Sequence, residues 1–253
     1  MKIEIIPCLK DNYSYIIIDL KNKNTCVVDP SESKPIINFL EKNNLQLNYI
    51  LNTHHHYDHV GGNAELKKKY KAKIVGFEGD CERIPEIDIM LKDGEIWKQD
   101  NFEAKVIHIP GHTLGHICFY FYNENNLFTG DTLFSLGCGR IFEGTYQQMF
   151  SSLEKIKKLP PKTKIYCGHE YTLQNSKFCI QHDKENQNLI KKIKDINEKL
   201  KNNKPTIPST LEDELKNNIF LRSDQENVKT NLNIGSSSPL VTFSKLRDLK
   251  DNF

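Results

Sequence analysis

Short apolar runs bounded by turn residues dominate the first 170 or so positions of the chain. They are rich in β-branched and aromatic residues, which favour the extended backbone of a strand. Most are four to seven residues long, the length of strands rather than helices. The pattern predicts strands over residues 3–7, 13–19, 25–30, 49–53, 73–77, 105–110, 116–122, 126–131 and 164–169.

Two segments between these runs have the spacing of an amphipathic helix instead. In residues 33–44, Ile36, Ile37 and Leu40 recur on one helical face. Residues 145–160 begin with Thr145, a residue that caps helices, and stop at Pro160, which cannot continue one. Strands and helices mixed in this way predict an α/β layered domain over residues 1–172.

After residue 172 the strand pattern disappears. Leu189, Ile193, Ile196 and Leu200 recur at helical spacing with lysines between them. A turn at 205–210 then precedes another helix, for which Ser209 and Glu212 have the spacing of a capping box. We therefore predict a second, mostly helical domain over residues 173–253.

Composition narrows the classes of function. The 253 residues carry 35 Lys and Arg against 33 Asp and Glu, a net charge of +2, so global charge favours neither a nucleic-acid nor a membrane partner. The seven cysteines are odd in number and contain no CxxC pair, which argues against a disulfide framework. No secretory signal or long apolar run opens the chain. A cytoplasmic enzyme is the expectation.

The stretch THHHYDHVGG (53–62) holds four histidines and one aspartate. Alternate side chains of a strand share a face, so His54 and His56 point together and His55 points away. Asp58 and His59 follow at once, where a loop and a helix are expected to begin. Imidazole and carboxylate donors suit Zn²⁺, Fe²⁺ or Mn²⁺, and the lack of a thiolate pair argues against a structural cysteine–zinc site.

Further candidate ligands stand at the ends of later predicted strands. They are His108, His112 and His116 in HIPGHTLGH, Asp131 in TGD and His169 in CGH. Neighbouring glycines let the backbone turn sharply at these points. Donors from several strand ends can meet on one rim of a sheet, so the sequence predicts a catalytic metal site there.

These motifs together resemble the metallo-β-lactamase-fold hydrolases and, more narrowly, the glyoxalase II (hydroxyacylglutathione hydrolase) family. The narrower resemblance rests on IPCLKDNYSYII (6–17), GCGRIFEGT (137–145), CGHEYT (167–172), PTIPSTL (205–211) and LRDLKDNF (246–253). It covers nearly the whole chain. It implies a four-layer αββα sandwich followed by the helical domain, which binds glutathione.

The resemblance also implies two divalent metal ions per chain, chiefly zinc with iron or manganese as alternatives. His55, His108 and His116 fall outside the implied ligands; we expect His116 to support a ligand and His55 to pack or hydrogen-bond behind the strand. One ion is held by His54, His56 and His112, the other by Asp58, His59 and His169, and Asp131 bridges both.

The implied reaction is hydrolysis of S-(2-hydroxyacyl)glutathione, chiefly S-D-lactoylglutathione, to glutathione and D-lactate, the second step of methylglyoxal detoxification. A hydroxide bridging the ions attacks the thioester carbonyl. Asp58 orients that nucleophile and Asp131 holds the metal pair, so both are catalytic. The implied substrate-binding residues are Arg140, Phe142, Tyr171, Arg247 and Lys250, where Phe142 replaces the tyrosine common in the family. A monomer or weak dimer is expected.

Three other interpretations of the sequence compete with this one. A glutathione persulfide dioxygenase shares the fold but uses a single iron. A fold-related nuclease needs a basic track and an added specificity domain, neither of which is evident. A non-catalytic scaffold could dispense with ligands, yet all seven implied ligand positions are filled.

Overall fold

The computed structural model describes all 253 residues, and its internal contacts divide the chain into two compact units. The first unit contains residues 1–108 and 115–130, and the second contains residues 109–114 and 131–253. The sequence-based domain boundary at residue 172 stays a prediction.

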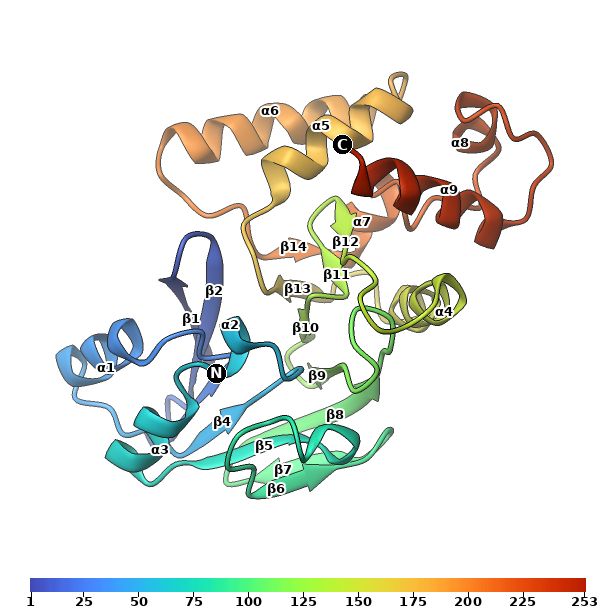
Figure 1. The fold of residues 1–253 in the computed structure, drawn as a ribbon. Helices are drawn as coiled ribbons and strands as arrows, with labels where there is room; N and C mark the ends of the chain where they lie inside the picture. The colour runs from blue at the N-terminus through green and yellow to red at the C-terminus, as the bar shows by residue number, and fades with distance from the viewer. The chain divides into compact units, whose positions relative to one another are not determined.

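A six-stranded sheet forms one layer of the first unit (Figure 1). Its strands lie in chain order, antiparallel from β1 to β3 and parallel from β3 to β6. Every residue of β2 is buried, as expected for a central strand covered on both faces. The strands are β1 (Lys2–Cys8), β2 (Asn12–Ile18), β3 (Thr25–Val28), β4 (Tyr49–Leu51), β5 (Lys73–Phe77) and β6 (Ile89–Leu91).

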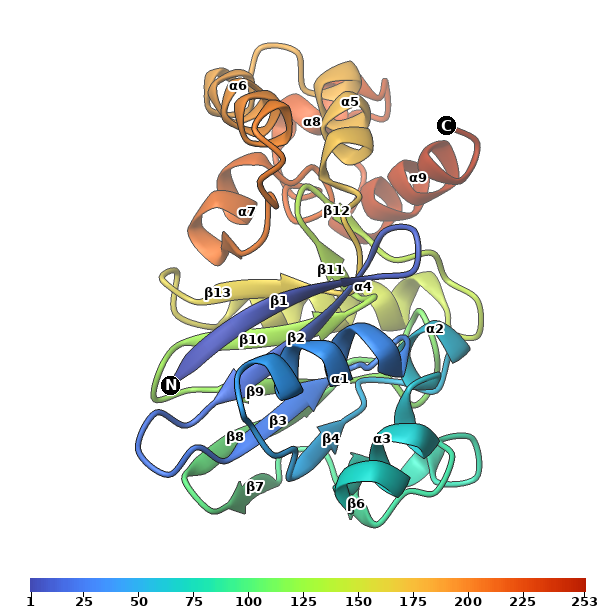
Figure 2. The ribbon, with the colours of Figure 1, turned by 90° about the vertical axis from the view of Figure 1, so that its left-hand side faces the viewer.

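Helices cover the outer face of this sheet. Ile36 and Leu40 of α1 (Ser33–Lys42) and Leu66 of α3 (Asn63–Tyr70) are fully buried in one cluster with strand residues such as Val27 and Ile50. Figure 2 shows α1 lying across β1 to β3. The apolar residues at helical spacing in the sequence thus form the helix face that packs on the sheet. The short helices α2 (Tyr57–Val60) and η1 (Glu78–Asp80) lie in the connections.

Four more strands of the first unit pair in the order β10-β9-β8-β7. Aromatic rings join them to the first sheet: Tyr15 of β2 lies 5.4 Å from Phe128 of β10, and Tyr49 of β4 lies 5.3 Å from Trp97 of β7. Two sheets facing each other under a helical cover give this unit an α/β/β layering. The strands are β7 (Ile96–Gln99), β8 (Phe102–His108), β9 (Ile117–Phe121) and β10 (Asn126–Gly130).

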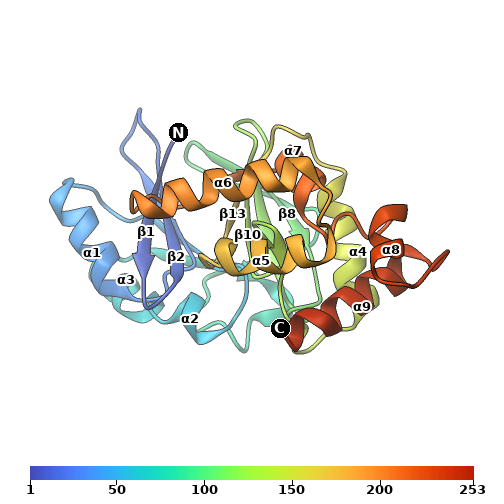
Figure 3. The ribbon, with the colours of Figure 1, turned by 90° about the horizontal axis from the view of Figure 1, so that it is seen from above.

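The second unit is mostly helical. Phe150 and Phe243 lie 5.8 Å apart where α4 packs on α9, and α5 lies beside α6 (Figure 3). Its strands are β11 (Leu133–Phe134), β12 (Gly137–Cys138), β13 (Lys164–Cys167) and β14 (Ser209–Thr210). Its helices are α4 (Tyr146–Lys157), α5 (Thr172–His182), α6 (Gln187–Lys201), α7 (Leu211–Asn217), α8 (Glu226–Asn231) and α9 (Pro239–Asp251).

The predicted helix caps have different outcomes. Thr145 caps α4 and forms a full capping box with Gln148. The box predicted for Ser209 and Glu212 is wrong by one residue: Thr210 is the N-cap and accepts a hydrogen bond from the Asp213 amide. Ser209 instead pairs with Ile165 in the short β13–β14 ladder, so its backbone is committed to a strand. None of the helices is both long and apolar enough to cross a membrane.

Candidate active site

The histidine-rich stretch follows β4 in the first unit. His54 is fully buried, and its Nε2 lies 3.1 Å from Nδ1 of His56. His56 is the N-cap residue of α2, whose first residues present Asp58 and His59. His54 and His56 therefore lie together as predicted, although β4 ends at Leu51 and neither residue is part of the strand. Two ring nitrogens at this separation can both bind one cation.

Asp29, at the end of β3, is a residue that the sequence analysis missed. It is buried, and its carboxylate accepts hydrogen bonds from the Thr53 amide (2.8 Å) and the Thr53 hydroxyl (2.6 Å). Its Oδ2 also lies 3.0 Å from Nδ1 of His59. A carboxylate on one ring nitrogen fixes the tautomer and leaves the other nitrogen for a metal. The Asp in VVDP at a predicted strand end was the available signal.

Asp58 is held by Asn12, at the start of β2. The Asn12 amide donates to Asp58 Oδ2 (2.9 Å) and to the Asp58 backbone carbonyl (3.1 Å). Asn12 is buried, whereas the Asp58 side chain is about two-fifths exposed. One carboxylate oxygen is thus fixed while the group stays accessible.

The three histidines expected to lie outside the ligand set have other contacts in the first unit. His55 Nδ1 lies 3.1 Å from Oδ2 of the buried Asp80, so the expected hydrogen bond is present. His116 is buried and stacks on the ring of His54 at 4.5 Å, which supports that candidate ligand. His108 stacks on Phe77 at 4.6 Å.

Gly130 illustrates why glycine borders these positions. Its φ of +46° lies in the left-handed region. A Cβ there would lie 2.3 Å from the Thr53 hydroxyl and 2.7 Å from the His116 ring, so any side chain would displace both groups. The sequence-level expectation of a sharp turn here holds, and close packing adds a second reason.

The second unit brings the other candidate ligands together. Asp131 Oδ2 lies 3.5 Å from Nε2 of His112 and 3.2 Å from Nε2 of His169, and all three side chains are buried. His112 donates from Nδ1 to the Arg140 carbonyl (2.7 Å), which leaves Nε2 turned toward Asp131. The His169 ring stacks on Tyr171 at 4.6 Å.

These donor sets fit a divalent metal ion. They combine imidazole nitrogens with carboxylate oxygens, and most of the side chains are buried. Outer hydrogen bonds fix the rings of His59 and His112, as metal ligands require. The donor chemistry suits borderline cations such as Zn²⁺, Fe²⁺ and Mn²⁺.

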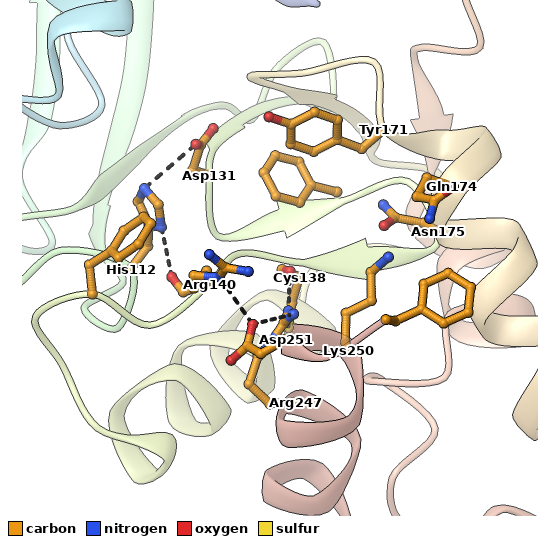
Figure 4. A pocket seen from close by; sticks show the side chains of 13 residues that line it. His112, Asp131, Cys138, Arg140, Tyr171, Gln174, Asn175, Arg247, Lys250 and Asp251 are labelled. Atoms are coloured by element: carbon orange, nitrogen blue, oxygen red, sulfur yellow. Dashed lines mark hydrogen bonds and ion pairs between the residues drawn. The ribbon is translucent and has the colours of Figure 1, made fainter.

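A pocket of about 470 Å³ opens beside His112 and Asp131 in the second unit (Figure 4). Every predicted substrate-binding residue lines this pocket. Phe142 is exposed and its ring lies 5.1 Å from His112. The lining residues are His112, Asp131, Phe134, Cys138, Arg140, Phe142, Tyr171, Gln174, Asn175, Arg247, Lys250, Asp251 and Phe253.

The three cations of this pocket differ in environment. The Arg140 side chain is about half exposed, while Arg247 is buried and donates from Nη1 to the Cys138 carbonyl at 2.7 Å. The Lys250 ammonium lies 4.9 Å from the centre of the Phe253 ring and 5.4 Å from that of Phe178. Burial lowers the pKa of Lys250 below its usual 10.5, and the charge of Arg247 lowers it further.

Comparison with known proteins places this chain among its relatives. Residues 10–169 match the family described as Metallo-beta-lactamase superfamily, and residues 170–253 match Hydroxyacylglutathione hydrolase C-terminus. A hydroxyacylglutathione hydrolase of Pelagibacter ubique is 65% identical over all of both chains. One of Rhodopseudomonas palustris (strain BisB5) is 43% identical over 99% of this chain and 98% of its own.

Among solved structures, the BLEG-1 B3 metallo-beta-lactamase aligns with a TM-score of 0.69 at 21% identity. The alignment covers 87% of this chain and 99% of that protein. This likeness and the family matches confirm the predicted α/β fold class with a helical C-terminal region. The chain belongs to the metallo-β-lactamase superfamily and, within it, to the hydroxyacylglutathione hydrolases.

Proposed function

We propose that this chain hydrolyses the thioester of S-(2-hydroxyacyl)glutathiones, chiefly S-D-lactoylglutathione, releasing glutathione and D-lactate. Its place is then the second step of methylglyoxal detoxification. The observation that carries the proposal is end-to-end similarity, at 65% identity, to a protein named hydroxyacylglutathione hydrolase. The match to the family's C-terminal region over residues 170–253 supports the same reaction class.

The metal assignment deepens this proposal. We assign one ion to His54, His56 and His112, a second to Asp58, His59 and His169, and the bridging position to Asp131. Support comes from the family pattern and from the donor groups within each unit. Zinc is the proposed metal, with iron or manganese as alternatives, because the donors are imidazoles and carboxylates without thiolates.

Such ions, when bound, lower the pKa of water toward neutrality and polarise a carbonyl oxygen, which is the chemistry that thioester hydrolysis needs. Asp58 is proposed to accept a hydrogen bond from the attacking water, because Asn12 fixes one of its oxygens and the carboxylate stays accessible. The leaving glutathione thiolate is a weak base, so the reaction needs no strong protein acid.

The pocket supplies the proposed contacts for glutathione. Glutathione carries two carboxylates, and charge-assisted hydrogen bonds from cations recognise such groups. Arg140, Arg247 and Lys250 supply three cations, and the Tyr171 hydroxyl supplies a donor. Phe142 adds an apolar side chain to the pocket wall, at the position where the family resemblance implies a tyrosine.

The test is an assay with purified protein and S-D-lactoylglutathione, followed at the thioester absorbance. The proposal expects turnover that stops on chelation. Oxygen uptake with glutathione persulfide, in the absence of thioester hydrolysis, would instead support the single-iron dioxygenase.

The pH profile of KM should reveal Lys250. Its ammonium binds a carboxylate only when protonated, and its pKa lies below 10.5, so KM should rise as pH increases through that lowered pKa. In Lys250→Arg the guanidinium stays charged throughout, and the alkaline rise should disappear. An identical rise in both proteins, measured by steady-state kinetics, would exclude Lys250 as its cause.

We propose a cytoplasmic location, supported by seven cysteines that form no disulfide. A monomer or weak dimer, without nucleic-acid or membrane partners, stays a prediction from the sequence.

A further inference from the structure

We propose that Asp251 is a positioning residue that holds the guanidinium groups of Arg140 and Arg247 in the arrangement that receives a carboxylate of the glutathione moiety. The inference rests on the proposed function, since it concerns how the same pocket recognises its substrate.

The contacts converge on one oxygen at the end of α9. Asp251 Oδ1 accepts hydrogen bonds from Arg247 Nη2 at 2.9 Å and from Arg140 Nε at 3.2 Å (Figure 4). Arg247 and Asp251 lie one helical turn apart, so the helix itself fixes that pair. Arg140, by contrast, is brought to the site from a distant part of the chain.

Arg247 also holds the backbone that leads to Arg140. Its Nη1 donates to the carbonyl of Cys138 at 2.7 Å and to that of Gly139 at 3.4 Å. The last turn of α9 therefore restrains both the peptide segment before Arg140, through Arg247, and the Arg140 side chain itself, through Asp251.

The exposure of the two arginines shows where this restraint matters. Arg247 is 4% exposed and is fixed by its carbonyl contacts even without Asp251. The Arg140 side chain is 55% exposed, so it would sample many rotamers if Asp251 did not hold it. A flexible cation loses rotamer freedom when it binds substrate, and a restrained one has already lost it.

The charges in the pocket make this assignment testable, because the two possible roles of Asp251 predict opposite changes in KM. Apart from Asp131, Asp251 is the only acidic side chain that lines the pocket, and it stands among three cations. If Asp251 acted only as a nearby negative charge, it would repel the substrate's carboxylates, and removing the charge would lower KM. If it positions Arg140, removing the charge raises KM.

Asp251→Asn is the informative variant, because it keeps the size of the side chain and removes the charge. We expect KM for S-D-lactoylglutathione to rise roughly 5-fold, with kcat within about 2-fold of the parent, because Asp251 is proposed to act on substrate binding and not on the reacting atoms. Asp251→Glu, which restores the carboxylate, should recover part of the loss. The matched control is Asp248→Asn, one turn earlier on α9, where the carboxylate accepts from the exposed Tyr146 hydroxyl outside the pocket. Its KM should not change.

A double-mutant cycle with Arg140→Ala separates positioning from a general structural effect. Arg140→Ala should raise KM, and Asp251→Asn should then add little, because the group it positions is gone. An unchanged or lowered KM in Asp251→Asn would overturn the proposal, and so would full additivity with Arg140→Ala. If Asp251→Asn fails to fold, Arg140→Ala still decides, because an unchanged KM there contradicts the proposal. Absence of turnover in the parent protein would instead count against the proposed function.

Discussion

Replacing Asp131 with asparagine is expected to reduce kcat/KM for S-D-lactoylglutathione by roughly 100-fold or more. Even the loss of a residue that only hydrogen-bonds a metal ligand typically lowers metal affinity or activity by about 10- to 100-fold. The carboxylate lies within 3.5 Å of Nε2 of both His112 and His169, so it is central to the donor group of the second unit. Asparagine keeps the shape but loses the negative charge and one acceptor oxygen. Metal content should therefore fall together with activity.

Elemental analysis of the purified variant, beside its kinetics, checks this expectation. Asp195→Asn is a suitable control, because Asp195 forms a surface ion pair with Lys199 and such pairs contribute little. That variant should match the parent in metal content and turnover. An Asp131→Asn protein that retains two equivalents of metal would refute the bridging assignment.

Asp29→Ala is expected to have the next largest effect, a loss of metal affinity of about 10- to 100-fold. Asp29 is buried and joins Thr53 to His59, so its removal frees the His59 ring and leaves the Thr53 amide and hydroxyl without their acceptor. The free energy of unfolding should also fall, because buried donors without partners are destabilising.

Competition with a chromophoric chelator measures that affinity independently of turnover. Asp29→Asn offers a milder companion, since an amide can still accept from the Thr53 amide. The order of affinities should be parent, then Asp29→Asn, then Asp29→Ala. Equal affinity in all three proteins would show that Asp29 does not orient a metal ligand.

Much of the fold could be predicted from local sequence patterns. Apolar runs predicted the central strands because β-branched and aromatic residues bury continuously there, and the Thr145 cap was predicted correctly from its local sequence. Strands that are partly exposed or very short were missed: β6 and β7 have exposed or half-buried positions, and β11, β12 and β14 are two residues long. Such strands form because partners are already in place, which no local pattern encodes.

In the candidate site, too, local residue types could be predicted from the sequence and long-range contacts could not. The stretch 53–62 shows its metal chemistry in its own residue types. Asp29 does not, because its role depends on His59 lying 30 residues away in the chain. The Asp251–Arg140 contact spans 111 residues and joins a helix end to a loop, so its two halves look like ordinary charged surface in the sequence.

The central claim is that hydrolysis depends on two metal ions held by these histidines and aspartates. Its most direct test is to strip the protein with a chelator, then return Zn²⁺ in measured amounts while following S-D-lactoylglutathione hydrolysis. We predict no turnover in the stripped protein and a rise that saturates at two equivalents per chain, with parallel runs in Fe²⁺ and Mn²⁺ identifying the best metal. Full turnover by the metal-free protein, or saturation at one equivalent, would contradict the account.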